Sequence, residues 1–314
     1  MTLKGLKIYR MTHHQNKENA FEAALRSRGW HESQYRFSQY VSFGLFDGDW
    51  PSRKSMFDQM NGKPWFLYPH AARPMVQYDG CVEPRRDCRA MFVSAPAGVY
   101  LMDKIGYPCE VVEVGWSLCP IRTFFPRATA DRITFAPIHP NANTFLSDVD
   151  KRLNLEAYRR LVKYAERHES TLTVRYVRDI KDNGLGEAMA EAHPNVIWKQ
   201  AFPDGSTDDI TRADLVVAHQ TFAYMAVALG VPTLMMGEDV PPRSGNSEAG
   251  FTYVQHWDDY KDYMIYPLDI LDEDVEETVQ MAIESDEPIR DWKANFIGHP
   301  FRPDYFVDCI EERL

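Results

Sequence analysis

Short apolar segments alternate with helix-forming segments along the whole chain, and this alternation constrains the fold more than any other feature. In the first half, strands are predicted at 6–10, 34–42, 64–69, 90–94 and 110–115, and helices at 18–28 and 98–105. In the second half, strands are predicted at 132–137, 171–177, 195–199, 214–218 and 231–236, and helices at 153–167, 185–192, 208–212 and 221–229. Alternating strands and helices form right-handed βαβ units and parallel sheets. The sequence therefore predicts an α/β fold of two Rossmann-like domains whose parallel sheets face a cleft.

The length of the chain, 314 residues, also fits two domains. A segment rich in proline and arginine, 116–132, is typical of a connection between domains. We expect an N-terminal domain at 1–120, a connector at 121–131, a C-terminal domain at 132–289 and a terminal helix at 290–314 that packs back across the junction.

Composition and charge narrow the class of protein. No apolar run reaches the roughly 18 residues of a membrane span, and the first residues lack the apolar core of a signal peptide, so a cytoplasmic protein is expected. The net charge of −11 argues against a general nucleic-acid binder, which needs a basic face. The charge is uneven, because residues 1–150 carry a net +3 and the remainder −14.

Known cofactor and metal motifs are missing from the sequence. Neither GxGxxG nor GxxxxGK[ST] occurs, which disfavours NAD enzymes and P-loop kinases. One pair of carboxylates with metal-binding spacing, Asp47 and Asp49, falls in the first domain, whereas the segment richest in chemistry lies in the second. We therefore predict no metal and no cofactor.

The richest segment for chemistry is 195–239, where three strands are followed by polar residues. One strand ends at Trp198 and Gln200, and the next leads into His219, Gln220 and Thr221 at a predicted helix start. Thr221 is the expected N-cap of that helix, and free amides at a helix start suit a diphosphate. A strand after Gly-Val-Pro then leads to an acidic pair that begins with Glu238. The competing interpretation is a βαβ unit without a ligand, in which His219 makes only a local hydrogen bond.

This order of residues resembles the donor-binding region of nucleotide-sugar glycosyltransferases of the GT-B type. The resemblance covers roughly 45 residues and implies that Trp198 and Gln200 recognise the base, the segment from His219 to Thr221 holds the diphosphate, and Glu238 lies near the sugar. A UDP-sugar is the favoured donor. The chain departs from the family at 223–226, where the glutamate that grips the ribose is missing.

Two further loops of the C-terminal domain follow predicted strands. The first offers His139 and Asn141 as short polar donors in the βα turn that normally approaches phosphates. The second offers Arg178, either as a phosphate clamp or in a surface ion pair with Asp179 or Asp182.

The first domain is expected to bind the acceptor and to supply a general base. His70 is the first candidate for that base and Asp49 the second, ahead of His13 and His14, because an inverting transfer needs a group that takes the acceptor's proton. The segment around His70 also resembles the His-bearing loop of polyol-phosphate and polysaccharide transferases.

The acceptor is less constrained. The net charge of +3 on residues 1–150 favours a polyanionic acceptor, with Arg85 and Arg86 as candidate acceptor contacts. The fold resemblance extends to bacteriophage DNA glucosyltransferases, which would make a hydroxymethylated pyrimidine in DNA one such acceptor. A cell-surface glycan or polyol-phosphate acceptor, a sugar-nucleotide 2-epimerase and a catalytically silent nucleotide-sugar binder are the alternatives.

Overall fold

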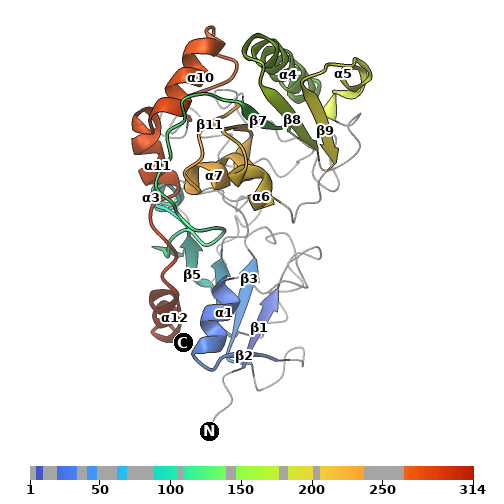
Figure 1. The fold of residues 1–314 in the computed structure, drawn as a ribbon. Coiled ribbons are helices and arrows are strands. Elements are labelled where there is room, and N and C mark those ends of the chain that lie inside the picture. Colours follow the sequence, from blue (N-terminus) through green and yellow to red (C-terminus); the bar gives the residue numbers. More distant parts are fainter. Residues whose placement is uncertain are drawn as a thin grey trace. The chain divides into compact units, whose positions relative to one another are not determined.

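The computed structural model describes residues 5–9, 20–33, 41–47, 62–68, 88–104, 109–138, 146–176, 183–200, 206–236 and 265–314. These residues fall into two compact units (Figure 1). The N-terminal unit takes its described residues from 5–118 and from Ala294–Leu314, and the C-terminal unit takes its own from 119–236 and 265–293. No helix in these ranges is long and apolar enough to cross a membrane.

The N-terminal unit is built on a six-stranded parallel sheet in the order β2-β1-β3-β4-β5-β6. Its elements are β1 (Gly5–Tyr9), α1 (Ala20–Ser27), β2 (His31–Glu32), β3 (Phe43–Asp47), β4 (Trp65–Tyr68), β5 (Cys88–Val93), α3 (Pro96–Lys104) and β6 (Glu110–Glu113). Every residue of β4 is buried, as expected for a parallel strand covered on both faces. The strand order is that of a doubly wound sheet, whose winding reverses between β1 and β3.

Strand β3 lies beyond the strand predicted from the sequence. The prediction covers 34–42, of which 34–40 lie outside the described residues, whereas the structure has its strand at Phe43–Asp47. Phe43, Leu45 and Phe46 are fully buried there, but Gly44 interrupts the apolar run and hides the strand from a pattern search.

Helix α12 (Pro303–Glu311) completes the core of the N-terminal unit. The Phe306 ring lies with its centroid 5.1 Å from that of Phe21 in α1 and 4.7 Å from that of Phe92 in β5. Residues from the far end of the chain thus contribute to the same apolar cluster as the first strands.

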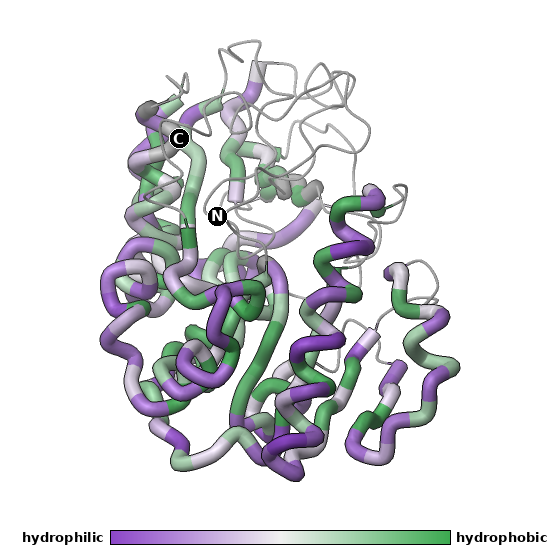
Figure 2. The backbone as a smooth tube through the Cα atoms, turned by 90° about the horizontal axis from the view of Figure 1, so that it is seen from above, coloured by the Kyte–Doolittle hydropathy of each residue, from purple (hydrophilic) through white to green (hydrophobic). Residues whose placement is uncertain are grey.

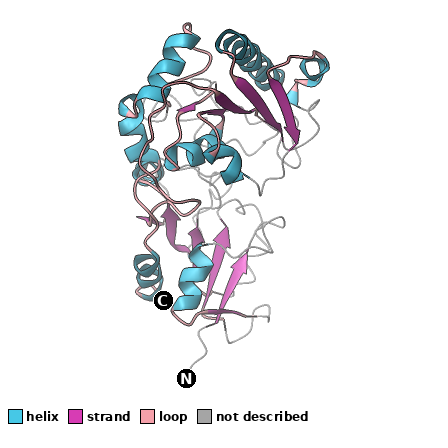
Figure 3. Cartoon of the chain, viewed as in Figure 1, coloured by secondary structure: helices cyan, strands magenta, loops and turns pink. Residues whose placement is uncertain are grey.

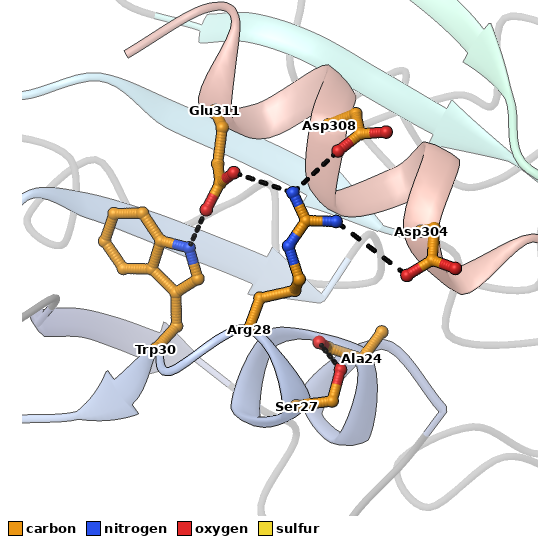
Figure 4. A network of polar contacts seen from close by, with 7 residues as sticks. All are labelled: Ala24, Ser27, Arg28, Trp30, Asp304, Asp308 and Glu311. Carbon is orange, nitrogen blue, oxygen red and sulfur yellow. Dashed lines mark hydrogen bonds and ion pairs between the residues drawn. The ribbon is translucent and has the colours of Figure 1, made fainter.

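A polar network on the rim of this core holds α12 beside α1 (Figure 4). Arg28 donates hydrogen bonds to Asp308 at 2.8 Å and to Glu311 at 3.0 Å, and it lies 3.8 Å from Asp304. The indole Nε1 of Trp30 donates to the other oxygen of Glu311 at 3.0 Å. Because the arginine and the indole share one carboxylate, the end of α12 is fixed in one position.

The terminal segment holds two helices where the sequence predicts one. Helix α11 (Arg290–Phe296) and helix α12 are separated by residues 297–302. Gly298 has a left-handed backbone, and Pro300 has no amide hydrogen to continue a helix. These two residues explain the break.

The C-terminal unit contains a five-stranded parallel sheet in the order β11-β10-β7-β8-β9 (Figure 3). Its elements are β7 (Arg132–Ala136), α4 (Asp148–His168), β8 (Thr171–Tyr176), α5 (Gly186–Ala190), β9 (Val196–Gln200), α6 (Ser206–Thr211), β10 (Leu215–Ala218), α7 (Gln220–Ala228), β11 (Thr233–Leu234) and α10 (Val275–Glu284). The first strand is central, with the next two on one side and the last two on the other. This is the Rossmann strand order, so the predicted fold class is confirmed for this unit.

Helix α4 begins earlier than the sequence pattern indicates, at Asp148 rather than at 153. The hydroxyl of Ser147 accepts a hydrogen bond from the amide of Asp150 at 3.1 Å, and the Asp150 carboxylate accepts one from the amide of Ser147 at 3.1 Å. This capping box fixes the start of the helix.

Hydrophilic and hydrophobic residues alternate around the helices of the tube view, as expected for helices with one buried face (Figure 2).

Candidate functional site

The strand order of the C-terminal unit defines a place where a ligand can bind. After β7 the chain passes through α4 to β8, which pairs with one side of β7. Strand β10 pairs with the other side of β7, and after it the chain passes through α7 to β11, still farther on that side. Ala136 and Ala218, the last residues of β7 and β10, are paired in register at this switch point. Ligands of doubly wound sheets bind outside the carboxyl ends of the strands at such a point.

Helix α7 begins directly at the switch point. His219 follows β10 with an extended backbone (φ −121°, ψ 144°) and is the N-cap, and its side chain accepts no bond from the helix's own amides. The amides of Gln220, Thr221 and Phe222 belong to the first turn, where no intrahelical acceptor exists. Together with the positive end of the helix dipole, they form a place suited to an anion.

The predicted N-cap of this helix is wrong by two residues. Thr221 lies inside the first turn, because the helix already starts at Gln220. The reason is that the chain bends immediately after the last buried residue of β10, so the extended residue before the bend, His219, takes the cap position. His219, Gln220 and Thr221 are therefore brought together, in one turn of backbone.

The other end of α7 is fixed against the segment that precedes β7. The amide of Arg122 donates to the carbonyl of Ala228 at 2.7 Å, and the amide of Phe125 donates to Gly230 at 3.1 Å. Gly230 has φ 73°, and a Cβ atom there would lie 2.2 Å from the carbonyl oxygen of Thr123. Only a glycine fits at this close approach. The two hydrogen bonds and this contact together fix the C-terminal end of α7 against residues 122–125.

A buried positive charge lies beside the first turn of α7. Arg175 of β8 is only 4% exposed, and its guanidinium carbon lies 4.8 Å from the centroid of the Phe222 ring. Its Nε donates to the carboxylate of Asp209 in α6 at 2.9 Å, and Lys199 donates to the other oxygen of the same carboxylate. Two cations, Arg175 and Lys199, thus share the carboxylate of Asp209, and Arg175 is the one that lies beside the first turn of α7.

Sequence reasoning missed Arg175, Asp209 and Lys199. A signal was present, because a charged residue inside an otherwise buried strand must find a partner. The partner, Asp209, was assigned only to a short helix, and nothing in the spacing of the sequence links it to β8.

The backbone that leaves β7 is held by two buried asparagines. The amide of Ile138 donates to Oδ1 of Asn154 at 2.8 Å. The carbonyl of Ile138 accepts from Nδ2 of Asn154 at 3.0 Å and from Nδ2 of Asn183 at 2.7 Å. Both asparagines are fully buried, so the direction in which the chain leaves β7 is fixed from within the unit.

Trp198 and Gln200, predicted to recognise the base, lie on the edge strand β9. The Trp198 ring packs on Tyr158 of α4, with the centroids 5.4 Å apart, and Gln200 is exposed at the end of the strand. Strand β9 is three strand spacings from β10, or about 14 Å at ~4.8 Å per spacing. The structure therefore places these two residues apart from the first turn of α7, and their role in base recognition stays a prediction.

The remaining predicted site residues lie outside the described residues, so their positions stay predictions: His13, His14, Asp49, His70, Arg85, Arg86, His139, Asn141, Arg178 and Glu238. Along the chain, His139 and Asn141 follow Ile138, and Arg178 follows β8. His13 and His14 follow β1, and Asp49 follows β3. Strands β1 and β3 are the pair between which the N-terminal sheet reverses its winding.

Comparison with known proteins supports the fold. No protein-family model matches the sequence, and no curated protein matches it. A putative UDP-N-acetylglucosamine 2-epimerase from Listeria monocytogenes matches with a TM-score of 0.55 at 11% identity, over 99% of this chain and 95% of that chain. The wall teichoic acid polymerase TagF, in its H548A form, matches with a TM-score of 0.50 at 10% identity, over 98% of this chain and 90% of that chain.

A third match is partial. Accessory secretory protein 1, 2 and 3 from Streptococcus pneumoniae has a TM-score of 0.44 at 10% identity, and the match covers 86% of this chain but only 50% of that chain. This chain thus spans half the length of that structure. At these identities the matches establish the fold, which is the GT-B-like pair of Rossmann-like units expected from the sequence.

Proposed function

We propose that the chain is a glycosyltransferase that moves a sugar from a nucleotide-sugar donor, with a UDP-sugar favoured, to an acceptor hydroxyl. The observation that carries the proposal is the start of α7, which lies at the switch point of a Rossmann sheet beside the buried Arg175. A diphosphate fits this place, because its oxygens accept hydrogen bonds from amides of the first turn while the positive end of the helix dipole favours its charge.

The proposed reaction is inverting and independent of a metal. The acceptor oxygen bonds to the anomeric carbon of the sugar as the bond from that carbon to the diphosphate breaks, and a base on the N-terminal unit takes the proton of the acceptor hydroxyl in the same step. The amides and the positive dipole end at the start of α7 stabilise the leaving diphosphate, which is the role that a divalent cation plays elsewhere. We keep His70 as the first candidate and Asp49 as the second, with His13 and His14 supported by their place after β1.

For the acceptor we propose a hydroxylated glycan ahead of the two polyanions, a polyol-phosphate chain and hydroxymethylated DNA. The net +3 of residues 1–150 favoured a polyanion, but the N-terminal unit also includes Ala294–Leu314, which is acidic. Residues 1–118 and 294–314 together hold 17 Lys+Arg and 16 Asp+Glu, a net of only +1. Within this balance, Arg28 is paired with Asp308 and Glu311 of α12 and is not left for a DNA backbone.

The donor site is tested by nucleotide binding. UDP in excess is expected to raise the melting temperature by mass action. His219→Ala is expected to weaken UDP binding about ten- to a hundredfold, the scale of one hydrogen bond to a charged group. The matched control is His193→Ala, a histidine of the same unit that lies before β9 and pairs with Glu166. Calorimetry measures both variants; an unchanged affinity in His219→Ala removes this residue from the site, and failure of all nucleoside diphosphates to bind removes the proposal.

Product analysis distinguishes sugar transfer from the alternative activities. Mass spectrometry after incubation with a UDP-sugar and candidate acceptors is expected to show an acceptor heavier by one sugar. Conversion of the UDP-sugar to an isomer without any acceptor would instead identify a 2-epimerase. Binding with no turnover would identify a silent nucleotide-sugar binder. Sugar on hydroxymethylated DNA, but not on glycans, would reverse the order of acceptors.

A further inference from the structure

Two cysteine thiols lie in contact at one edge of the N-terminal sheet. Cys88 is the first residue of β5, and Cys109 directly precedes the first residue of β6. Their Sγ atoms are 3.3 Å apart, and the Cys88 thiol is placed to donate to the Cys109 sulfur. Both residues carry free thiols and are partly exposed. A disulfide bond brings two sulfurs to about 2 Å, so this pair needs only a small movement to be joined.

The sheet holds the backbones of the two cysteines at a suitable separation. Strands β5 and β6 are adjacent and parallel, and Ala90 pairs with Glu110. One step back along both strands, Cys109 lies opposite Arg89, and Cys88 is its diagonal neighbour. Adjacent strands lie about 4.8 Å apart, and disulfides join residues whose Cα atoms are about 4.4–6.8 Å apart. The backbone spacing therefore favours a bond between these strands.

A β-bulge in β5 explains why the cysteine, and not the arginine beside it, meets Cys109. On the other side of β5, the register with β4 shifts by one residue after the pair of Trp65 and Cys88, which leaves Arg89 as an extra residue. Bulges re-aim the side chains around them. Arg89 is exposed, whereas the Cys88 thiol lies on the Cys109 sulfur. The irregular start of β5 thus brings the two thiols together.

The position of the pair limits what a bond between the thiols would do. Both cysteines lie at the amino ends of their strands, whereas ligands of doubly wound sheets bind outside the carboxyl ends. A disulfide would close a loop over residues 88–109, which contains β5 and α3. Closing such a loop restricts the unfolded chain and so stabilises the folded one. The expected effect is therefore on the stability of the N-terminal unit.

We propose that Cys88 and Cys109 form a redox site that reacts with a low-molecular-weight disulfide, such as oxidised glutathione, and becomes an intramolecular disulfide. The inference goes beyond the proposed function and does not depend on it. Partial exposure of both residues gives a small oxidant access to the thiols.

The reaction is two successive thiol–disulfide exchanges. The thiolate of one cysteine attacks a sulfur of the oxidant, whose S–S bond breaks, and one half of the oxidant leaves as a thiol. The thiolate of the second cysteine then attacks the protein sulfur of this mixed disulfide and releases the other half as a thiol. The two protons lost by the cysteines end on the two released thiols. Two electrons pass from the protein to the oxidant, and an external dithiol reverses the reaction.

Peptide mapping of the full chain tests whether the bond forms. The protein is incubated with mixtures of oxidised and reduced glutathione, its remaining thiols are alkylated, and a tryptic digest is analysed by mass spectrometry. Trypsin places Cys88 alone in peptide 87–89 and Cys109 with Cys119 in peptide 105–122. The wild type is expected to yield these two peptides linked. Cys88→Ser and Cys109→Ser are expected to yield no linked pair, and dithiothreitol is expected to separate the peptides of the wild type.

Cys119→Ser is the matched control, because it assigns the bond within peptide 105–122. Cys119 belongs to the C-terminal unit, where its thiol lies 3.9 Å from the carbonyl of Met225. The linked peptides are expected to persist in this variant. Their loss in Cys119→Ser overturns the inference, as does glutathione attached separately to Cys88 and Cys109 in the wild type. If a serine variant does not fold, the wild type and Cys119→Ser decide the question, since the linked peptides are measured in both.

Thermal unfolding tests what the bond does. Oxidation is expected to raise the melting temperature of the N-terminal unit by on the order of 10 °C in the wild type and in Cys119→Ser, for a loop of roughly 20 residues. The same treatment is expected to leave the melting temperature of Cys88→Ser unchanged. Linked peptides without any rise in the melting temperature would overturn the stabilising role.

Discussion

Asp209→Asn offers a quantitative test of the buried charge beside α7. Asp209 is shared by two cations in different surroundings, because the Arg175 side chain is 5% exposed and the Lys199 side chain 48%. Removing the carboxylate charge takes the Asp209 counterion from the buried Arg175, a change that in other proteins costs about 3–5 kcal/mol. We expect a loss of this size, although the amide oxygen of asparagine still accepts one hydrogen bond.

Lys199→Met is the matched control in the same network. The lysine is half exposed, so water replaces much of the lost interaction, and the expected cost is below about 1 kcal/mol. The Asp209–Arg175 contact remains in this variant. The comparison therefore separates the buried half of the network from the exposed half.

Urea unfolding followed by circular dichroism measures both variants. With a slope of about 2 kcal/mol per molar, the midpoint should fall by about 2 M in Asp209→Asn and by less than about 0.5 M in Lys199→Met. Hydrogen–deuterium exchange of peptides from 206–236 assigns the transition to the C-terminal unit. Equal shifts in the two variants would refute the reasoning, since they would mean that burial does not decide the cost.

Two further predictions concern the Asp214–Arg132 ion pair of the C-terminal unit and the core of the N-terminal unit. Burial alone raises the pKa of Asp214, but hydrogen bonds from Arg132 outweigh it and hold that pKa below its ordinary value. The ionised carboxylate therefore stabilises the unit above the unfolded pKa of about 3.9, and the stability is lost as pH falls through the lower, folded pKa. Asp214→Asn should cost about 1–2 kcal/mol at pH 7, and in urea titrations the difference should begin to shrink below about pH 4 and vanish only below the folded pKa. Phe306→Ala should destabilise the N-terminal unit by about 3–5 kcal/mol, and a cost below about 1 kcal/mol in denaturant titrations would contradict the packing of α12.

The fold was predictable because parallel strands leave a strong pattern. The run at 215–218 is buried on both faces and is apolar throughout, so both the strand and the helix after it follow from the sequence. Helix boundaries were less accessible: Thr221 has the chemistry of an N-cap, but the position of the bend after β10 gives that place to His219. Local sequence propensity does not specify where the chain bends after a strand, so it does not specify which residue becomes the N-cap.

The contacts that shape the site depend on long-range pairing. Asn154 lies 16 residues from Ile138 in sequence, and Arg175 lies 34 residues from Asp209. An asparagine in the middle of a helix gives no sign of its partner, because the hydrogen bonds arise only when α4 packs on β8. The sequence therefore yields candidate site residues but not the long-range contacts of Asn154 and Arg175.

The contribution of α12 to the first core also affects how the chain folds during synthesis. Multidomain chains generally fold from the N-terminus as they leave the ribosome. Here the N-terminal unit lacks Phe306, Val307 and Ile310 of its core until residues 303–311 have been made. By then all of the described residues of the C-terminal unit, 119–236 and 265–293, have already been synthesised. The unit that is synthesised first is thus the last to complete its core, and a nascent chain would expose the apolar surface around Phe21 and Phe92 throughout most of its translation.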